Sequence, residues 1–187
     1  IFYLTGTLIY NLIGKNNKIF SYWFFSPFLA IELLVNAHND LLMISLFVGS
    51  LFLLTHKKIF WAWVLLLASI LTKYGSFFGI PLMFLNEQRR VYFFRLMCIS
   101  LPIILQVQTV RPTLGWYYTW TYMFLPFAKL KRGSWVMINI MGLVLLLGYY
   151  PFIKFGGWIG SPLIPNQQLI FNLLLLLTFF KKVKSKS

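Results

Sequence analysis

Apolar stretches and short polar clusters alternate along the whole chain. Each apolar stretch is 10 to 17 residues long, and charged or amide side chains gather between them. Apolar runs of this kind recur too often to form a single buried core. The nine predicted segments are Ile1–Gly14, Ile19–Val35, Leu41–Leu54, Ile59–Thr72, Ser76–Leu85, Val91–Leu105, Trp116–Phe127, Ser134–Tyr150 and Gln167–Phe180.

The alternating pattern of a membrane barrel is absent, so we expect helices, which satisfy their own backbone hydrogen bonds in lipid. Several segments are shorter than the roughly 20 residues that cross a bilayer, so some are expected to be half-helices, and Pro27 is expected to interrupt the second. The pattern predicts an all-α fold, a polytopic transmembrane helical bundle with about eight or nine spanning or half-spanning segments. No linker divides it, so residues 1–187 are predicted to form one transmembrane domain.

Composition agrees with this class. Only 11% of the residues are charged and the mean hydropathy is +0.77, whereas a soluble domain has roughly 25% charged residues. The chain begins with Ile1 inside an apolar segment, without a basic region before it, so a signal peptide is not predicted. We interpret the chain as the C-terminal part of a longer one.

The net charge of +14 is compatible with nucleic-acid binding, but the basic residues stand in short clusters between apolar runs. Cytoplasmic loops of membrane proteins have this pattern, so no nucleic-acid partner is predicted. Threading the nine segments leaves only Lys73, Arg111 and Lys154 on the outer side, and it predicts a cytoplasmic C-terminus. The fourteen cations then placed together are Lys15, Lys18, Lys57, Lys58, Arg89, Arg90, Arg95, Lys129, Lys131, Arg132, Lys181, Lys182, Lys184 and Lys186.

Two carboxylates and an imidazole gather on the outer side in nine positions, as Glu32, His38 and Asp40, together with Asn39. Ionisable groups at membrane depth are costly and normally have a task or a partner. The alternatives are a wet loop in which Asn39 or Asp40 caps the next helix, or a divalent metal site, although the spacing matches no tight metal motif. No metal ligands are assigned.

Lys73 follows a fully apolar span and has no acidic residue near it in sequence. It either snorkels to the membrane interface or contacts a lipid phosphate. Gly75 and Pro81 would allow the backbone to break there and line a cavity.

A third candidate stretch, 106–120, combines Arg111 with aromatic residues that include Tyr117 and Trp120. An interfacial aromatic belt is the simplest explanation of the aromatic residues. Aromatic faces also stack on sugars, and Arg111 could bind phosphate through two hydrogen bonds. A nucleophile motif, a Gly-rich phosphate loop and a cysteine pair are all missing, and the single Cys98 is expected to be a small buried side chain.

Three stretches in this order resemble a known family. They are Glu32 followed by Asn36-Ala-His-Asn-Asp-Leu-Leu-Met43, then Leu67-Ala-Ser-Ile-Leu-Thr-Lys-Tyr-Gly-Ser-Phe-Phe-Gly-Ile-Pro81-Leu, then Thr113-Leu-Gly-Trp-Tyr-Tyr-Thr-Trp-Thr-Tyr-Met-Phe-Leu-Pro126. Together they resemble motifs of the GT-C superfamily of polyprenol-phosphate-dependent membrane glycosyltransferases. The resemblance is nearest the family 87-like and mannosyltransferase branch, and it covers roughly Pro27–Pro126.

This resemblance implies an inverting transfer of a mannose-like hexose from a polyprenyl-phosphate donor to a glycan or lipid acceptor. The active site would face outward from a membrane, as in a bacterial plasma membrane, and a divalent cation could take part. Such enzymes usually carry the main catalytic carboxylate in the first outer loop, which we expect to lie upstream of Ile1. The resemblance implies catalytic roles for Asp40 and His38, and substrate-binding roles for Glu32, Asn39, Lys73, Arg111, Tyr117 and Trp120.

Other classes remain open from the sequence alone. A polytopic transporter or lipid flippase also uses intramembrane charges and broken helices, but its inverted repeats are not visible here. A polysaccharide polymerase or ligase would share the lipid-linked substrate, and it usually has large outer loops with Arg and His. A purely structural membrane subunit would leave Glu32, Asp40 and Lys73 unexplained.

Overall fold

The computed structural model describes residues 1–36, 39–107, 115–156, 170 and 173. Within them the chain forms helices and no strands, which confirms the all-α prediction. The elements are α1 (Phe2–Leu12), α2 (Asn17–Phe24), α3 (Pro27–Leu29), the π-helix η1 (Ala30–Val35), α4 (Asp40–Thr55), α5 (Ile59–Thr72), the 3-10 helix η2 (Tyr74–Met83), α6 (Glu87–Val107), η3 (Gly115–Tyr118), α7 (Thr119–Phe124), η4 (Leu125–Ala128), α8 (Arg132–Leu146), η5 (Leu147–Tyr149) and α9 (Tyr150–Phe155).

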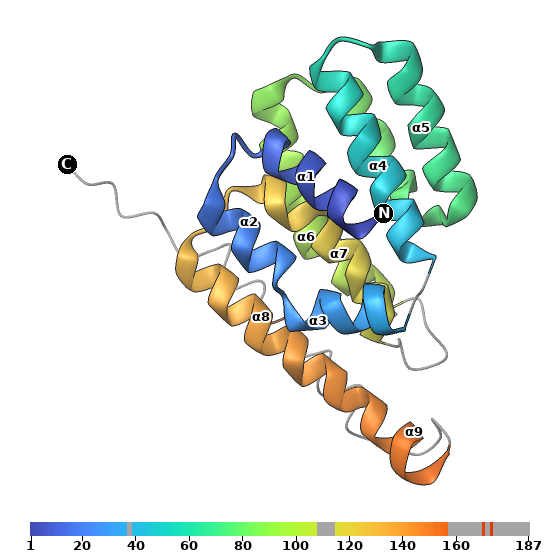
Figure 1. The fold of residues 1–187 in the computed structure, drawn as a ribbon, viewed down its shortest axis with the longest axis vertical. Helices are drawn as coiled ribbons and strands as arrows, with labels where there is room; N and C mark the ends of the chain where they lie inside the picture. Colours follow the sequence, from blue (N-terminus) through green and yellow to red (C-terminus); the bar gives the residue numbers. More distant parts are fainter. Residues whose placement is uncertain (37–38, 108–114, 157–169, 171–172, 174–187) are drawn as a thin grey trace, which may run out of the picture.

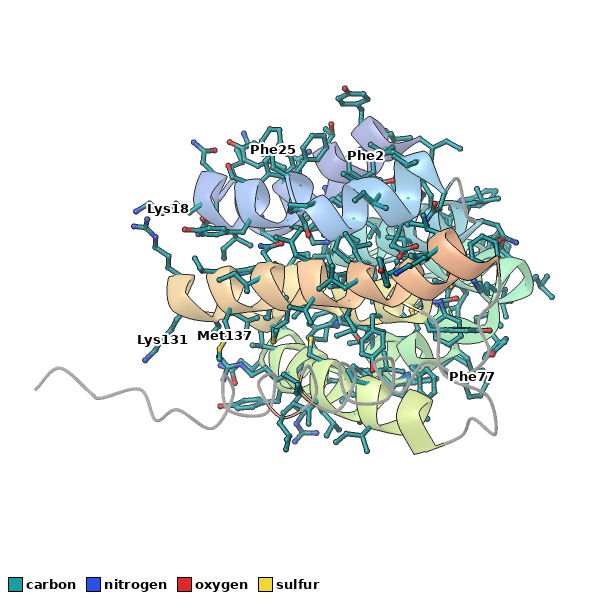
Figure 2. All side chains as sticks on the ribbon, turned by 90° about the horizontal axis from the view of Figure 1, so that it is seen from below. Phe2, Lys18, Phe25, Phe77, Lys131 and Met137 are labelled. Atoms are coloured by element: carbon teal, nitrogen blue, oxygen red, sulfur yellow. The ribbon has the colours of Figure 1, made fainter. Side chains whose placement is uncertain are left out.

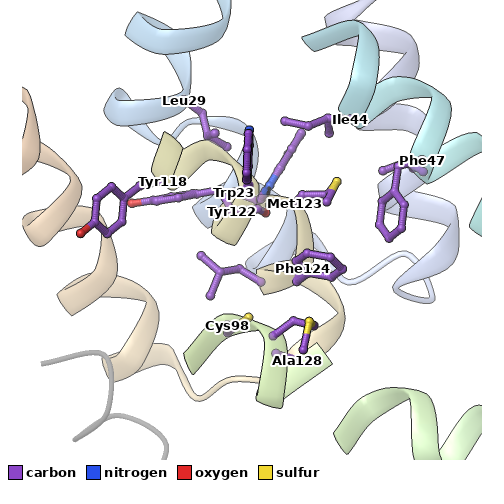
Figure 3. Packing of buried hydrophobic residues seen from close by; sticks show 14 of the residues in the cluster. Trp23, Leu29, Ile44, Phe47, Cys98, Tyr118, Tyr122, Met123, Phe124 and Ala128 are labelled. Atoms are coloured by element: carbon purple, nitrogen blue, oxygen red, sulfur yellow. Dashed lines mark hydrogen bonds between the residues drawn. The ribbon is translucent and has the colours of Figure 1, made fainter. Parts of the chain in front are cut away.

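The centre of the molecule is α7, in which all six residues are buried. It packs against α6 on one side and α4 on another, while α2 and α3 pack against α8 (Figure 1). Tyr122, Met123 and Phe124 of α7 lie beside side chains from α2 and α4, among them Trp23 and Phe47 (Figure 3). The Trp23 indole N–H donates to the Tyr122 carbonyl at 3.0 Å, so the core also contains a buried hydrogen bond.

Two hydrogen bonds fix the pairing of α4 with α5. The Ser69 hydroxyl donates to the Met43 carbonyl, and the Ser50 hydroxyl donates to the Ala62 carbonyl, each at 2.7 Å. The two helices are antiparallel and joined by a short turn, so the start of α4 lies beside the end of α5 (Figure 1). This pairing determines the position of the candidate site.

The helix boundaries largely follow the apolar segments, with one bend that was predicted and three differences. Pro27 bends the second segment by 43° between Asn17–Phe24 and Pro27–Val35, as predicted. The segment Ser76–Leu85 forms the 3-10 helix η2, and Trp116–Phe127 divides into η3, α7 and η4. The helical stretch from Arg132 continues beyond Tyr150, because Pro151 lies within the first two residues of α9, where a missing N–H costs little. The stretch ends at Gly156, which has φ 70°.

One helical stretch among the described residues, Arg132–Lys154, is long and apolar enough to cross a membrane, and the bent pair Asn17–Val35 makes a second if it counts as one span. Helices α4 and α5 are apolar but shorter. The ninth predicted segment, Gln167–Phe180, and the basic tail lie almost wholly outside the described residues. Cys98 is fully buried, as expected.

Candidate functional site

Asp40 is the first residue of α4, and its side chain is fully buried. Asn39 before it occupies the N-cap position, is exposed and makes no capping hydrogen bond through its side chain. An acidic side chain at this place faces the positive end of the helix macrodipole, which stabilises its charge. Neither Asn39 nor Asp40 caps the helix through its side chain, because the Asp40 carboxylate accepts hydrogen bonds from other partners.

Lys73 is the partner of Asp40. It follows the last residue of α5 in extended backbone conformation, and its Nζ lies 2.8 Å from Asp40 Oδ2. The Lys73 side chain is 19% exposed while Asp40 is 0% exposed, so the ion pair contacts the surroundings only through the lysine. A buried pair of this kind is stable only if its remaining hydrogen-bonding groups are also satisfied.

Trp120 of α7 satisfies the other carboxylate oxygen. Its indole N–H donates to Asp40 Oδ1 at 2.8 Å, and the tryptophan is 1% exposed. Gly75 permits this approach: a Cβ added there would lie 2.5 Å from Trp120 Cδ2. The side chain that orients Asp40 therefore comes from a segment 80 residues away.

Aromatic rings surround the ammonium group. Lys73 Nζ lies 5.6 Å from the ring centroid of Tyr117 and 5.8 Å from that of Trp120, within the range of cation–π attraction. Tyr74 and Tyr117 both pack edge-on against Trp120, with centroid separations of 5.0 and 5.3 Å. We call Asp40, Lys73, Trp120 and Tyr117 the ion-pair site.

A second polar cluster contains Glu32, Asn36 and Tyr149. Glu32 is fully buried in the π-helix η1, which closes with a hydrogen bond from the Asn36 N–H to the Ile31 carbonyl. The Tyr149 hydroxyl lies 2.9 Å from both carboxylate oxygens of Glu32, and Asn36 Nδ2 donates to Oε2 at 3.1 Å. π-helical turns are rare and often occur at functional sites.

The two clusters belong to the same end of the molecule. Asn36 and Asp40 are four residues apart, so their Cα atoms cannot be more than about 14 Å apart. The structure thus brings Glu32, Asp40, Lys73, Tyr117 and Trp120 to one region, and their catalytic and substrate-binding roles stay predictions. His38 and Arg111 lie outside the described residues.

Sequence reasoning missed Tyr149, Tyr74 and the pairing role of Asn36. Tyr149 is 117 residues from Glu32, and within an apolar segment it looks like any interfacial tyrosine. Among the described residues no group of three His, Cys, Asp or Glu side chains could hold a metal. Both oxygens of the Asp40 carboxylate accept hydrogen bonds, one from Lys73 and one from the Trp120 indole N–H. This arrangement does not fit a metal ligand, so no step of the reaction is assigned to a divalent ion.

One long apolar helical stretch and many exposed apolar side chains fit the class of membrane-associated helical proteins. A protein-family model described as the MptA_B family, alpha-(1->6)-mannopyranosyltransferase, N-terminal domain, matches residues 8–88. The match confirms the resemblance to mannosyltransferases, is consistent with the family 87-like branch, and supports a glycosyltransferase. The matched segment contains Glu32, Asp40 and Lys73 but not Tyr117 or Trp120. No curated protein and no solved structure matches the chain.

Proposed function

We propose that this chain forms part of an integral membrane glycosyltransferase. It transfers a mannose-like hexose, with inversion, from a polyprenyl-phosphate donor to a glycan or lipid acceptor on the extracytoplasmic face. The observation that carries this proposal is the buried Asp40–Lys73 ion pair, which lies among aromatic rings and within a segment similar to a mannosyltransferase family. An ammonium group beside aromatic rings is a suitable receptor for a sugar attached to phosphate.

Membrane insertion is supported by the outer faces of the helices. Large apolar side chains of α5 are exposed, and soluble monomers rarely expose a continuous apolar patch of this kind. The exposed residues on α5 are Ile59, Phe60, Trp61, Val64, Leu67 and Leu71. Lipid would cover this face, so the shorter helices α4 and α5 would also lie in the membrane.

The orientation is supported by the distribution of charge. Lys18 and Lys131 lie at one end of the molecule, and Phe77, close in sequence to Lys73, lies near the other (Figure 2). Under the positive-inside rule the end with the basic turns faces the cytoplasm, so the ion-pair site faces outward.

The transfer reaction makes specific demands on this site. A carboxylate removes the proton of the acceptor hydroxyl, the oxygen attacks the anomeric carbon, and the bond from that carbon to the lipid phosphate breaks on the opposite face. The electron pair of that bond stays on the phosphate oxygen, so negative charge grows on the leaving group. A preorganised cation close to this oxygen stabilises the transition state.

Lys73 is the described residue best suited to this task. Its side chain is partly exposed, so its ammonium can contact a phosphate without leaving the site. Asp40 is buried and both its oxygens already accept hydrogen bonds, so we assign it the role of positioning Lys73 and Trp120. Arg111 would provide a second phosphate contact, and His38 and Asn39 would bind the sugar or acceptor.

The aromatic residues have different roles in the proposal. Tyr117 is half-buried beside Lys73, so its ring can pack against a sugar. Trp120 is buried and holds Asp40 by a hydrogen bond, so its effect on substrate would be indirect.

The test is sugar transfer by the full-length enzyme in membranes, from a polyprenyl-phosphate mannose donor to added acceptor. Replacing Lys73→Ala is expected to lower kcat about 100-fold or more, as loss of one charge-stabilising donor does elsewhere. Lys154→Ala, another lysine predicted on the outer side, serves as the control and is expected to retain activity. Unchanged transfer by Lys73→Ala would remove Lys73 from the mechanism, and movement of the lipid-linked sugar without transfer would favour a flippase.

A further inference from the structure

A cavity of about 370 Å³ lies at the opposite end of the molecule from the ion-pair site. Leu51 and Thr55 line it near the end of α4, whereas Asp40 begins that helix. Fifteen residues of α-helix separate Asp40 from Thr55, which places the two sites about 22 Å apart along the axis. The cavity therefore cannot be part of the ion-pair site.

Four segments of the chain line this cavity. They are the residues on either side of the turn between α1 and α2, the last turns of α4, the first turns of α6, and η4 with the residue that follows it. They bring ten basic residues to the same end, and Arg95 belongs there because it donates to the Ala128 carbonyl at 2.9 Å. The residues are Lys15, Lys18, Lys57, Lys58, Arg89, Arg90, Arg95, Lys129, Lys131 and Arg132.

The lining of the cavity has an apolar part and a polar part. Leu12, Ile13, Ile19, Leu51, Val91, Phe94, Pro126 and Phe127 form the apolar part. Arg90, Lys129, Glu87 and Thr55 form the polar part, in which two cations outnumber one carboxylate. A ligand that fits both parts has an anionic head and a hydrocarbon chain.

The two cations are arranged differently. The Arg90 Nε–H donates to the Leu82 carbonyl at 3.1 Å, which fixes the guanidinium while its terminal nitrogens make no protein hydrogen bond in the described part of the chain. Lys129 is exposed, has φ 51°, and makes no side-chain hydrogen bond within the described residues. A guanidinium held by one hydrogen bond and an exposed ammonium can bind a phosphodiester together, and Glu87 can accept a hydrogen bond from a headgroup hydroxyl.

We propose that this cavity, which we call the basic-end pocket, binds the headgroup and first acyl carbons of one anionic phospholipid. Charge complementarity selects the ligand, because ten cations at one end attract an anionic lipid and not a neutral one. The volume falls in the range of roughly 300–1,000 Å³ found for small-molecule sites. The proposal does not depend on the transfer reaction.

The experiment measures lipid binding to the purified full-length protein in neutral detergent. Dioleoyl phosphatidylglycerol and dioleoyl phosphatidylcholine are titrated separately, and bound lipid is counted by native mass spectrometry. We expect one phosphatidylglycerol to remain bound at concentrations at which phosphatidylcholine does not, and to raise Tm.

Variants distinguish the pocket from the general charge of this end. Lys129→Gln is expected to weaken phosphatidylglycerol binding about fivefold, because each cation contributes about 1 kcal/mol. The double variant Arg90→Gln, Lys129→Gln is expected to weaken it about 25-fold. Lys131→Gln is the matched control. It removes the same charge only two residues from Lys129, but the Lys131 side chain does not line the cavity. Lys129→Gln alters an exposed side chain, so it should fold even if the double variant does not.

Three results would overturn the proposal. Equal retention of the two lipids would show an apolar crevice without headgroup selection. Equal weakening by Lys129→Gln and Lys131→Gln would show diffuse attraction to the whole basic end. Stabilisation by inorganic phosphate equal to that by phosphatidylglycerol would show an anion site that does not use the apolar lining.

Discussion

Lys73 and Asp40 are 33 residues apart, and the pairing between them explains why neither is an ordinary interfacial residue. An isolated lysine at the end of an apolar helix can extend to the membrane surface, whereas here its ammonium is held by a fully buried carboxylate. Trp120 occupies the second carboxylate oxygen, so the three side chains form one unit. Each of them should therefore affect stability through the others.

We predict measurable coupling between Asp40 and Lys73. Asp40→Asn and Lys73→Gln should each destabilise the protein, and the double variant should lose less than the sum of the single losses. The expected coupling is about 1.5–3 kcal/mol, as for hydrogen bonds to charged groups. Equilibrium unfolding in mixed micelles measures it, and strict additivity would contradict a native ion pair.

Gly75 is predicted to be sensitive to a single added methyl group. Gly75→Ala would push its Cβ to 2.5 Å from the Trp120 ring, so the indole or the start of η2 must move, at a cost of about 1–3 kcal/mol. Gly133→Ala in α8 is the control, because nothing lies within 4 Å of the added Cβ. The control should be neutral or slightly stabilising, and equal unfolding free energies for the two variants would refute the close packing.

At the scale of elements, the antiparallel pair α4 and α5 places the ion-pair site, and η1 places the second cluster. Ser69 and Ser50 hold the register of the pair through backbone carbonyls of the facing helix. The start of α4 lies beside the end of α5, so an acidic residue at the start of α4 is close to a basic residue at the end of α5. The π-helical turn of η1 orients Glu32 toward Tyr149 of η5, which lies between α8 and α9 in the long helical stretch.

Tyr149 is therefore predicted to connect the long helix to η1. Tyr149→Phe removes the hydroxyl that donates to the buried Glu32 carboxylate, which should cost about 1.5–3 kcal/mol. Tyr150→Phe is a matched control, since Tyr150 is 49% exposed and its ring still faces Lys154 after the change. Unfolding in mixed micelles should separate the two variants, and equal stability would contradict this role.

At the scale of the whole molecule, the chain has two chemically different ends. One end carries the two carboxylate clusters with their aromatic neighbours, and the other carries the basic turns around a cavity. Apolar side chains cover much of the surface between them. This arrangement suits the proposed membrane enzyme, in which the lipid-linked substrate reacts at the carboxylate end and the basic end sets the orientation in the membrane.

Sidedness can be measured directly by cysteine labelling. Cys98 is fully buried, so the chain gives a low background. Asn36→Cys is predicted to react with a membrane-impermeant maleimide from the extracytoplasmic side, and Lys58→Cys only after the membrane is opened. Labelling of both positions from the same side would contradict the proposed topology.

The sequence predicted most helix positions because apolar segments and polar clusters reflect burial and solvent contact directly. It also predicted that Glu32, Asp40 and Lys73 share one side, since the clustered cations define the other side. It did not predict the 3-10 and π-helical geometry of η2 and η1, because packing against neighbouring helices decides it. The predicted eighth segment ends at Tyr150, whereas the helical stretch continues through α9 to Phe155.

By itself, the sequence determined the helical class, the chemical contrast between the two ends and the residue types available for a reaction. These properties depend on local composition and on the cost of placing charge among apolar groups. Only the tertiary structure decided that Asp40 meets Lys73 and Trp120, that Tyr149 meets Glu32, and that four segments distant in sequence line one pocket. Those contacts arise from the register and angle of packed helices, which depend on the shapes of many side chains at once and leave no local pattern in the chain.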